Sequence, residues 1–187
     1  TYGMGENIMI RLAKLLDRGI PISKIRDLRG TVYLAPADER LHYESVGGWS
    51  IDELRTDRAL YAEAFATQYR ENDHIRGRAV TERYGDRILV QNPPMPPLER
   101  EELDRVYALP YERTYHPAIR EVRFSITHNR GCFGGCAFCA IAYHQGRAVR
   151  SRSIDSVVRE AELLTKLPDF KGYIHDVGGP TANFRGP

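Results

Sequence analysis

The stretch EVRFSITHNRGCFGGCAFCAI, residues 121–141, carries the pattern on which the fold prediction depends. Val122, Phe124 and Ile126 alternate with polar side chains, which predicts a strand over residues 121–127. A glycine-rich loop follows directly, and all three cysteines of the chain lie in it. We therefore predict a strand that ends in a cysteine loop.

A helix and a second strand complete this unit. Ser153 is a good N-cap, and apolar side chains follow it at helical spacing up to Leu164. Residues 172–177 have the composition of a strand and run into the pair Gly178 and Gly179. The order strand, loop, helix, strand predicts a βαβ unit, whose parallel strands end at the same edge. The cysteine loop and the glycine pair should therefore be neighbours.

Three cysteines, Cys132, Cys136 and Cys139, have the spacing C-x3-C-x2-C. Thiolates at this spacing can converge on zinc, copper(I) or an iron-sulfur cluster. A closed zinc site and a cubane of four irons each normally take four protein ligands. Either a histidine or an outside group completes the site, or one metal position stays open for a ligand.

The cysteine spacing, with Phe138 at the aromatic position, resembles the C-x3-C-x-aromatic-C signature of radical S-adenosylmethionine (SAM) enzymes. The resemblance narrows to the YgiQ-type radical SAM family, an uncharacterised protein family. It rests on the stretches YGMGE at 2–6, QNPP at 91–94, LPYERTYHP at 109–117, NRGCFGGCAFCAI at 129–141, HQGR at 144–147, SRS at 151–153 and DVGGPTANF at 176–184.

The resemblance implies an α/β chain in two parts. Residues 1–117 would be an interdomain α/β region, made of the tail of a Rossmann-like N-terminal domain plus a linker. Residues 118–187 would be the N-terminal part of a radical SAM barrel, an incomplete (β/α) barrel that opens with the βαβ unit. The family pattern has more residues after Pro117 than this chain, which predicts either a short loop or missing residues there.

The resemblance also implies cofactors and their ligands. A 4Fe-4S cluster would be bound by the three cysteines Cys132, Cys136 and Cys139, and its open iron would bind SAM. Phe138 would lie near the adenine, and Gly178 and Gly179 would hold the SAM amino group through backbone atoms.

The implied reaction is reductive cleavage of SAM to a 5′-deoxyadenosyl radical that takes hydrogen from an unknown substrate. An electron donor such as flavodoxin or ferredoxin would supply the electron. We expect an enzyme of unknown reaction. The fragment alone should be inactive, because later barrel strands also contribute to the SAM site.

The alternative is a non-catalytic zinc- or cluster-stabilised binding or structural module. Zinc would be held by the three cysteines plus His128 or His144, which are both close in sequence. The NPPMPP segment at residues 92–97 would then dock another domain. Metal analysis separates the two. Bound iron with acid-labile sulfide would support the enzyme, and bound zinc without iron or sulfide would support the module.

Charge and hydropathy narrow the partners. The 187 residues include 27 Lys and Arg against 25 Asp and Glu, a net charge of +2, which indicates no nucleic-acid partner. No apolar run is long enough for a membrane helix and no signal peptide is recognisable, so we expect a cytoplasmic protein without membrane contact. The strand at 172–177 would have an exposed edge, through which the fragment could self-associate.

Further elements are expected ahead of the barrel unit. Helical spacing from Ile8 to Leu16 predicts a first helix, and Ser50 begins a capping-box pattern that predicts a helix to about Tyr69. Strands are expected at residues 31–35 and 87–91, a short acidic helix at 98–108, and a domain boundary between residues 110 and 117.

Overall fold

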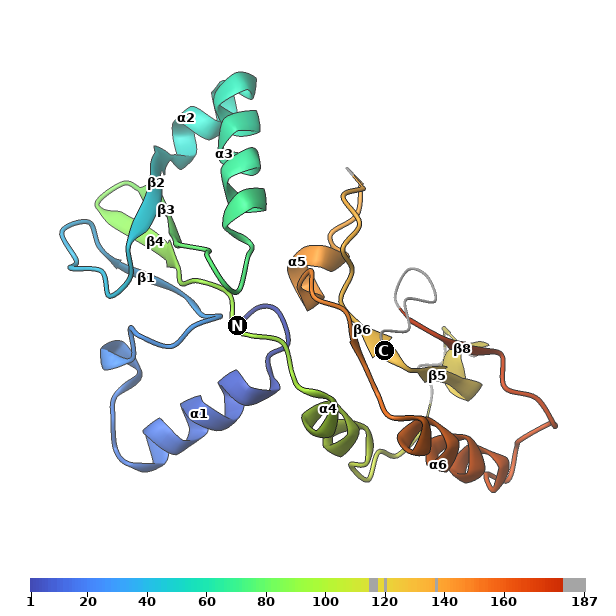
Figure 1. Ribbon diagram of the computed structural model, residues 1–187. Coiled ribbons are helices and arrows are strands. Elements are labelled where there is room, and N and C mark those ends of the chain that lie inside the picture. The colour runs from blue at the N-terminus through green and yellow to red at the C-terminus, as the bar shows by residue number, and fades with distance from the viewer. Residues whose placement is uncertain (115–117, 120, 137, 180–187) are drawn as a thin grey trace. The chain divides into compact units, whose positions relative to one another are not determined.

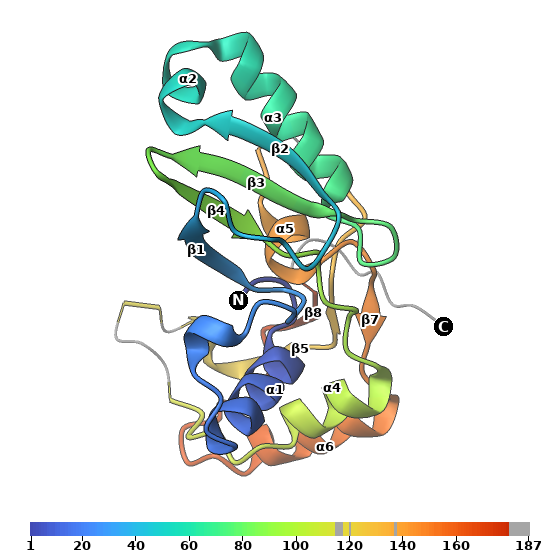
Figure 2. The ribbon, with the colours of Figure 1, turned by 90° about the vertical axis from the view of Figure 1, so that its left-hand side faces the viewer.

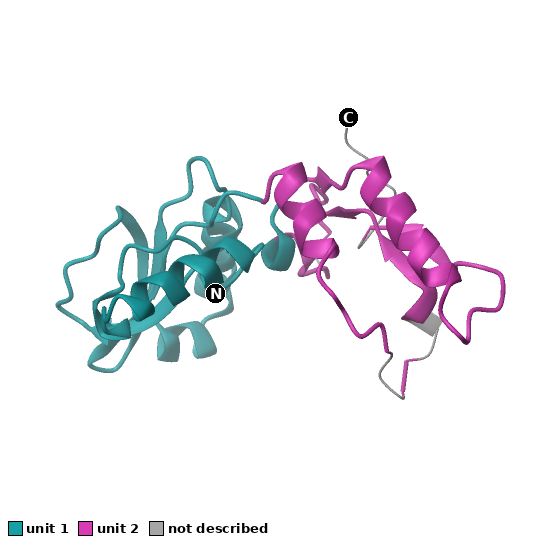
Figure 3. Ribbon diagram, turned by 90° about the horizontal axis from the view of Figure 1, so that it is seen from below, with its two compact units in different colours: residues 1–97, 143–147 teal, residues 98–142, 148–187 magenta. Residues whose placement is uncertain are grey.

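The computed structural model describes residues 1–114, 118–119, 121–136 and 138–179. The chain divides into two compact units, residues 1–97 with 143–147 (unit 1) and residues 98–142 with 148–187 (unit 2), coloured separately in Figure 3. Unit 2 begins at residue 98, ahead of the boundary predicted between residues 110 and 117. Within unit 2 the Asp104 carboxylate accepts a hydrogen bond from the Ser153 backbone N–H. That domain boundary stays a prediction.

Unit 1 contains a four-stranded sheet with the strand order β1-β4-β3-β2. β2 and β3 are parallel, and the other neighbours are antiparallel. Helices α2 and α3 pack on β2 and β3 (Figures 1 and 2). The elements are α1 (Glu6–Asp17), η1 (Ile22–Lys24), β1 (Val32–Pro36), β2 (Ser45–Ser50), α2 (Ile51–Thr56), α3 (Arg58–Glu71), β3 (Ala79–Tyr84) and β4 (Arg87–Gln91).

The proline-rich segment, residues 92–97, packs against the hydrophobic core that surrounds α1 in unit 1. Ile8 of α1 is fully buried, and Met95 packs on the core that it forms. The Gly30 N–H donates to the Pro93 carbonyl at 2.8 Å, and the Arg29 Nε donates to the Pro94 carbonyl at 2.9 Å. The predicted first helix is confirmed, and the NPPMPP segment is bound within unit 1.

The predicted helix from Ser50 to about Tyr69 is two helices. The capping box at Ser50 is present, but α2 ends at Thr56. Asp57 has an extended backbone, and its carboxylate accepts from the N–H groups of Ala59 and Leu60. An aspartate that binds the backbone in this way caps a new helix, which is why α3 starts separately.

The predicted βαβ order is present in unit 2, with shorter strands than expected. β5 and β8 are parallel, with Ile126 opposite Val177, and α6 lies between them in sequence (Figure 1). The elements of this part of the chain are α4 (Arg100–Tyr107), η2 (Glu121–Phe124), β5 (Ser125–Thr127), β6 (Asn129–Arg130), α5 (Ile141–Gln145), β7 (Arg150–Ser151), α6 (Ile154–Thr165) and β8 (Asp176–Gly178).

Two corrections concern these strands. Residues 121–124 form the 3₁₀ turn η2 instead of the first half of a strand, and β8 starts at Asp176 instead of residue 172. The Ser153 cap of α6 is confirmed, since its Oγ accepts from the Ser156 N–H at 3.1 Å. The α/β class is confirmed, and the incomplete barrel stays a prediction. No helix among the described residues is long and apolar enough to cross a membrane.

Glu71 links the end of α3 to the chain that leads into β3. Its carboxylate accepts hydrogen bonds from the Arg78 N–H at 2.8 Å and from the Arg78 guanidinium at 2.5 and 3.2 Å. The guanidinium bond is the main reason why the pKa of the Glu71 carboxyl is lowered. Because the pKa of Glu71 is lower in the folded state, its ionised carboxylate stabilises the fold at pH values above the unfolded-state pKa. This stabilisation is lost as the pH falls through the folded-state pKa.

We predict that Glu71→Gln lowers the free energy of unfolding at neutral pH. Its decline as the pH falls below the ordinary titration range of a glutamate carboxyl should also become flatter, because the titrating group is gone. Urea titrations at several pH values measure both effects. Glu63→Gln, at an exposed position of the same helix, is the control. An equally steep acid decline in Glu71→Gln would contradict the prediction.

Candidate functional site

The carboxyl ends of β5 and β8 bring the start of the cysteine loop beside the glycine pair. Thr127 lies opposite Gly178 in the parallel register. The N–H of His128, the next residue, donates to the Gly178 carbonyl at 2.9 Å. On its other side, the His128 carbonyl accepts from the Arg152 N–H at 2.8 Å. The backbone that leads into the loop is therefore held between β8 and the residue after β7.

Asn129 lies directly against Gly179. A Cβ on Gly179 would be 2.3 Å from Asn129 Oδ1 and 2.5 Å from Nδ2, which no real side chain tolerates. A Cβ on Gly178 would instead meet the Asp176 carboxylate at 2.9 Å, and that carboxylate is the end of an exposed, flexible side chain. The two glycines therefore differ, since close packing requires only the second one to lack a side chain.

A tight turn follows Asn129. Gly131 has a φ of 88°, and a Cβ there would be 2.1 Å from the Ala148 carbonyl oxygen. Glycine is the residue that combines a positive φ with such a close approach. β6 ends directly before Gly131 and pairs antiparallel with β7, with Arg130 opposite Arg150. The cysteine loop therefore leaves the sheet from a fixed point.

The three cysteines lie beyond this turn. Cys132 is buried, Cys136 is exposed and Cys139 is half-buried. A Cβ on Gly134 would be 3.2 Å from the Cys132 Sγ and 3.9 Å from the Cys136 Sγ, so two thiols flank one glycine. Across the described part of the chain, no three His, Cys, Asp or Glu side chains are grouped to hold a metal ion. The cysteines as metal ligands therefore stay a prediction.

Phe138 is the most exposed of the residues predicted for the site. Its side chain is 93% exposed beside Cys139. The structure thus brings Gly178 and Gly179 to the start of the loop, and it leaves Phe138 in solvent. Pro180, which follows the glycine pair, lies outside the described residues.

Arg152 is a residue of this edge that the sequence patterns did not single out. Its guanidinium is 2% exposed and donates to the Thr127 carbonyl at 2.8 Å. It also pairs with Glu160 and donates to Ser156 of α6. It lies over the ring of Tyr107, 4.2 Å from the centroid. A possible signal was the spacing of Ser and Glu, four and eight residues after the arginine.

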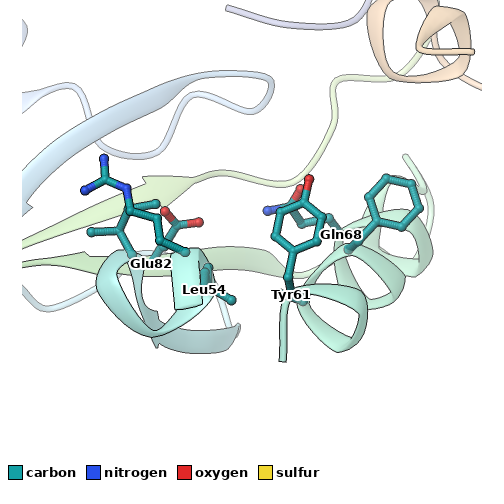
Figure 4. A pocket seen from close by; sticks show the side chains of 8 residues that line it. Leu54, Tyr61, Gln68 and Glu82 are labelled. Carbon is teal, nitrogen blue, oxygen red and sulfur yellow. The ribbon is translucent and has the colours of Figure 1, made fainter. Parts of the chain in front are cut away.

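Unit 1 has a separate pocket of about 230 Å3 between α2, α3 and β3 (Figure 4). Leu54 of α2 and Tyr61 of α3 provide apolar lining, and Gln68 and Glu82 provide polar groups. None of the residues predicted to bind the cluster or SAM lines it. The chemistry predicted from the sequence therefore belongs to unit 2.

Comparisons with known proteins identify the family of the chain. The family described as Radical SAM N-terminal matches residues 1–128. A UPF0313 protein of Clostridium botulinum (strain ATCC 19397 / Type A) is 50% identical over an alignment of 193 residues. The alignment covers 98% of this chain and 30% of that protein. One from Clostridium perfringens (strain ATCC 13124) is 50% identical over 196 residues, 100% of this chain and 30% of that protein. No solved structure matches.

The chain belongs to the radical SAM family that these UPF0313 proteins represent, which confirms the family predicted from its motifs. It spans about 30% of the length of these relatives. The C. perfringens alignment has 196 positions for a chain of 187 residues, so at least nine residues of the relative have no counterpart here. The short loop or missing residues predicted after Pro117 stay a prediction, because Pro117 lies outside the described residues.

The contact between Gly179 and Asn129 gives a steric prediction. Gly179→Ala should lower the free energy of unfolding by about 1–3 kcal/mol, because the added methyl group overlaps the Asn129 amide. Gly178→Ala, the matched control, should cost less because the Asp176 carboxylate can move. Urea unfolding followed by circular dichroism measures both.

A double variant tests the cause of that loss. Adding Asn129→Ala to Gly179→Ala removes the overlapping amide, so most of the lost stability should return. If the two substitutions were additive, the steric account of Gly179 would be wrong.

Proposed function

We propose that this chain carries the cluster loop and the first part of the SAM site of a radical SAM enzyme. The observation that supports it best is the parallel pairing of β5 and β8, with the hydrogen bond from the His128 N–H to the Gly178 carbonyl. This pairing puts the start of the cysteine loop and the glycine pair at the carboxyl edge of the strands. Active sites of (β/α) barrels are built at that edge.

The donor chemistry of the loop fits a 4Fe-4S cluster. Cys132, Cys136 and Cys139 would hold it, since thiolates are the usual protein ligands of such clusters. Gly134 leaves space for two of the thiols to approach one centre. Three cysteines for four irons leave one iron for another ligand, which supports a cofactor bound at the cluster rather than an electron-transfer site alone.

The chain's own groups have defined tasks in this proposal. The backbone of Gly178 and Gly179 would bind the amino group of SAM, and Phe138, which is exposed, would lie near the adenine. The turn at Gly131 would hold the loop at the sheet edge. When bound, the cluster and SAM together supply reductive cleavage to a 5′-deoxyadenosyl radical, which abstracts hydrogen from the substrate.

Partners of the whole protein belong to the same proposal. An electron donor such as flavodoxin or ferredoxin would reduce the site, and the cytoplasm would provide the reducing environment. β5 and β8 form a two-stranded sheet in the described part of the chain. Further strands of a complete barrel, or a second copy, would pair along its edges.

Anaerobic reconstitution with iron and sulfide tests the cluster. We predict about four irons and four acid-labile sulfides per chain, as for a single cubane. Cys132→Ser, Cys136→Ser and Cys139→Ser should each lose most of both, because a ligand is missing. Metal and sulfide analysis of the purified proteins gives the numbers.

His144→Ala is the matched control, because His144 is a candidate fourth ligand in the zinc alternative. The enzyme proposal predicts that this variant keeps its iron and sulfide. One zinc per chain without sulfide would instead establish the structural module. Loss of that zinc in His144→Ala would identify His144 as the fourth ligand, and retained zinc would leave His128.

A further inference from the structure

Asn129 has a buried amide that nothing in the described chain satisfies. The residue is 0% exposed, and neither Oδ1 nor Nδ2 has a hydrogen-bond partner among the described residues. Asn92 of unit 1 shows the ordinary case: it is 1% exposed, and its Nδ2 donates to two carbonyl oxygens and a hydroxyl. Buried polar groups without partners are rare and costly, so Asn129 needs an explanation.

The amide lies at the carboxyl edge of β5 and β8. Both amide atoms are within 2.5 Å of where a Cβ of Gly179 would be. The residue also lies three positions before Cys132, just ahead of the turn at Gly131. The amide therefore lies between the glycine pair and the start of the cysteine loop, which are the two segments of the proposed site.

The chemistry of the amide restricts the ligand. Oδ1 accepts hydrogen bonds and Nδ2 donates them. A carboxylate alone would satisfy only Nδ2, and a cation alone would satisfy only Oδ1. One group that carries a donor and an acceptor close together satisfies both, and the ammonium and carboxylate of an α-amino acid form such a group. The carboxylate, and the amino group once it has lost a proton, are also suitable oxygen and nitrogen ligands for an iron that the three cysteines leave open.

We infer that the Asn129 amide binds the amino-acid end of SAM, with Oδ1 accepting from the amino group and Nδ2 donating to the carboxylate. The inference rests on the proposed function, because it takes SAM as the ligand. It assigns to the residue before the cysteine loop a binding role that complements the backbone of Gly178 and Gly179.

The first test measures stability without cofactor. Asn129→Ala and Asn129→Leu remove an amide that has no partner in the described chain, so neither should lower the urea midpoint of the cofactor-free chain by as much as Asn92→Ala, which removes three hydrogen bonds. If both Asn129 variants were as destabilised as Asn92→Ala, the amide would be structural and the inference would be overturned.

The second test measures binding to the cluster-loaded chain by equilibrium dialysis. The probes are SAM and decarboxylated SAM, which keeps the ammonium and lacks the carboxylate. Asn129→Ala should weaken SAM binding by roughly 10- to 100-fold and should weaken decarboxylated SAM binding less, because one of its two hydrogen bonds has no counterpart there. Thr127→Ala, at an exposed position two residues earlier, is the control and should bind both normally.

The outcomes separate the inference from the proposed function. If Asn129→Ala weakened the binding of both probes equally, the amide would contact a part of SAM other than the carboxylate. If SAM binding were unchanged, the amide would not contact SAM. Either result, or a cluster-loaded chain that binds no SAM, overturns the inference while the cluster remains. A wild-type chain that takes up no iron and sulfide overturns the proposed function and the inference with it.

Discussion

The carboxyl end of β5 and β8 in unit 2 depends on the contacts of the buried Arg152 guanidinium. This arginine binds the carbonyl of Thr127, the last residue of β5, and it pairs with Glu160 of α6. Its backbone N–H donates to the His128 carbonyl, while the His128 N–H donates to Gly178 of β8. A charge this deeply buried is costly unless it is paired and hydrogen-bonded, so its contacts fix the end of β5 relative to α6.

Close approach of backbone then shapes the site that starts there. Gly131 turns the chain against the Ala148 carbonyl, and Gly179 leaves space for the Asn129 amide. In both places a single methyl group would overlap neighbouring atoms, which are the Ala148 carbonyl oxygen at Gly131 and the Asn129 amide at Gly179. The glycines of this edge thus allow two chain segments to lie close together.

Short sequence patterns predicted the helices and strands that are specified by residues close together in the chain. The Ser153 cap, the helix after it and the parallel pair with the glycine pair at its end were all confirmed. Residues 121–124 alternate like a strand but form a 3₁₀ turn, because the register of β5 with β8 begins only at Ser125. The end of α2 at Thr56 depends on the side chain of Asp57, a cap inside an otherwise helical pattern.

Long-range contacts explain what the sequence did not reveal. The burial of Arg152 depends on Tyr107 and Glu160, which are 45 positions before and eight positions after it. Asn129 becomes notable only when β8 brings Gly179 against it. The three cysteines, in contrast, could be named as candidate metal ligands from their spacing. That they bind a metal stays a prediction.

Electron paramagnetic resonance of the anaerobically reconstituted and reduced chain, with and without SAM, tests the central claim most directly. The account predicts the signal of a reduced 4Fe-4S cluster whose g values shift when SAM is added, because SAM binds the iron that the three cysteines leave open. A cluster signal that is identical with and without SAM, or no cluster signal at all, would contradict a SAM site at the end of β5 and β8.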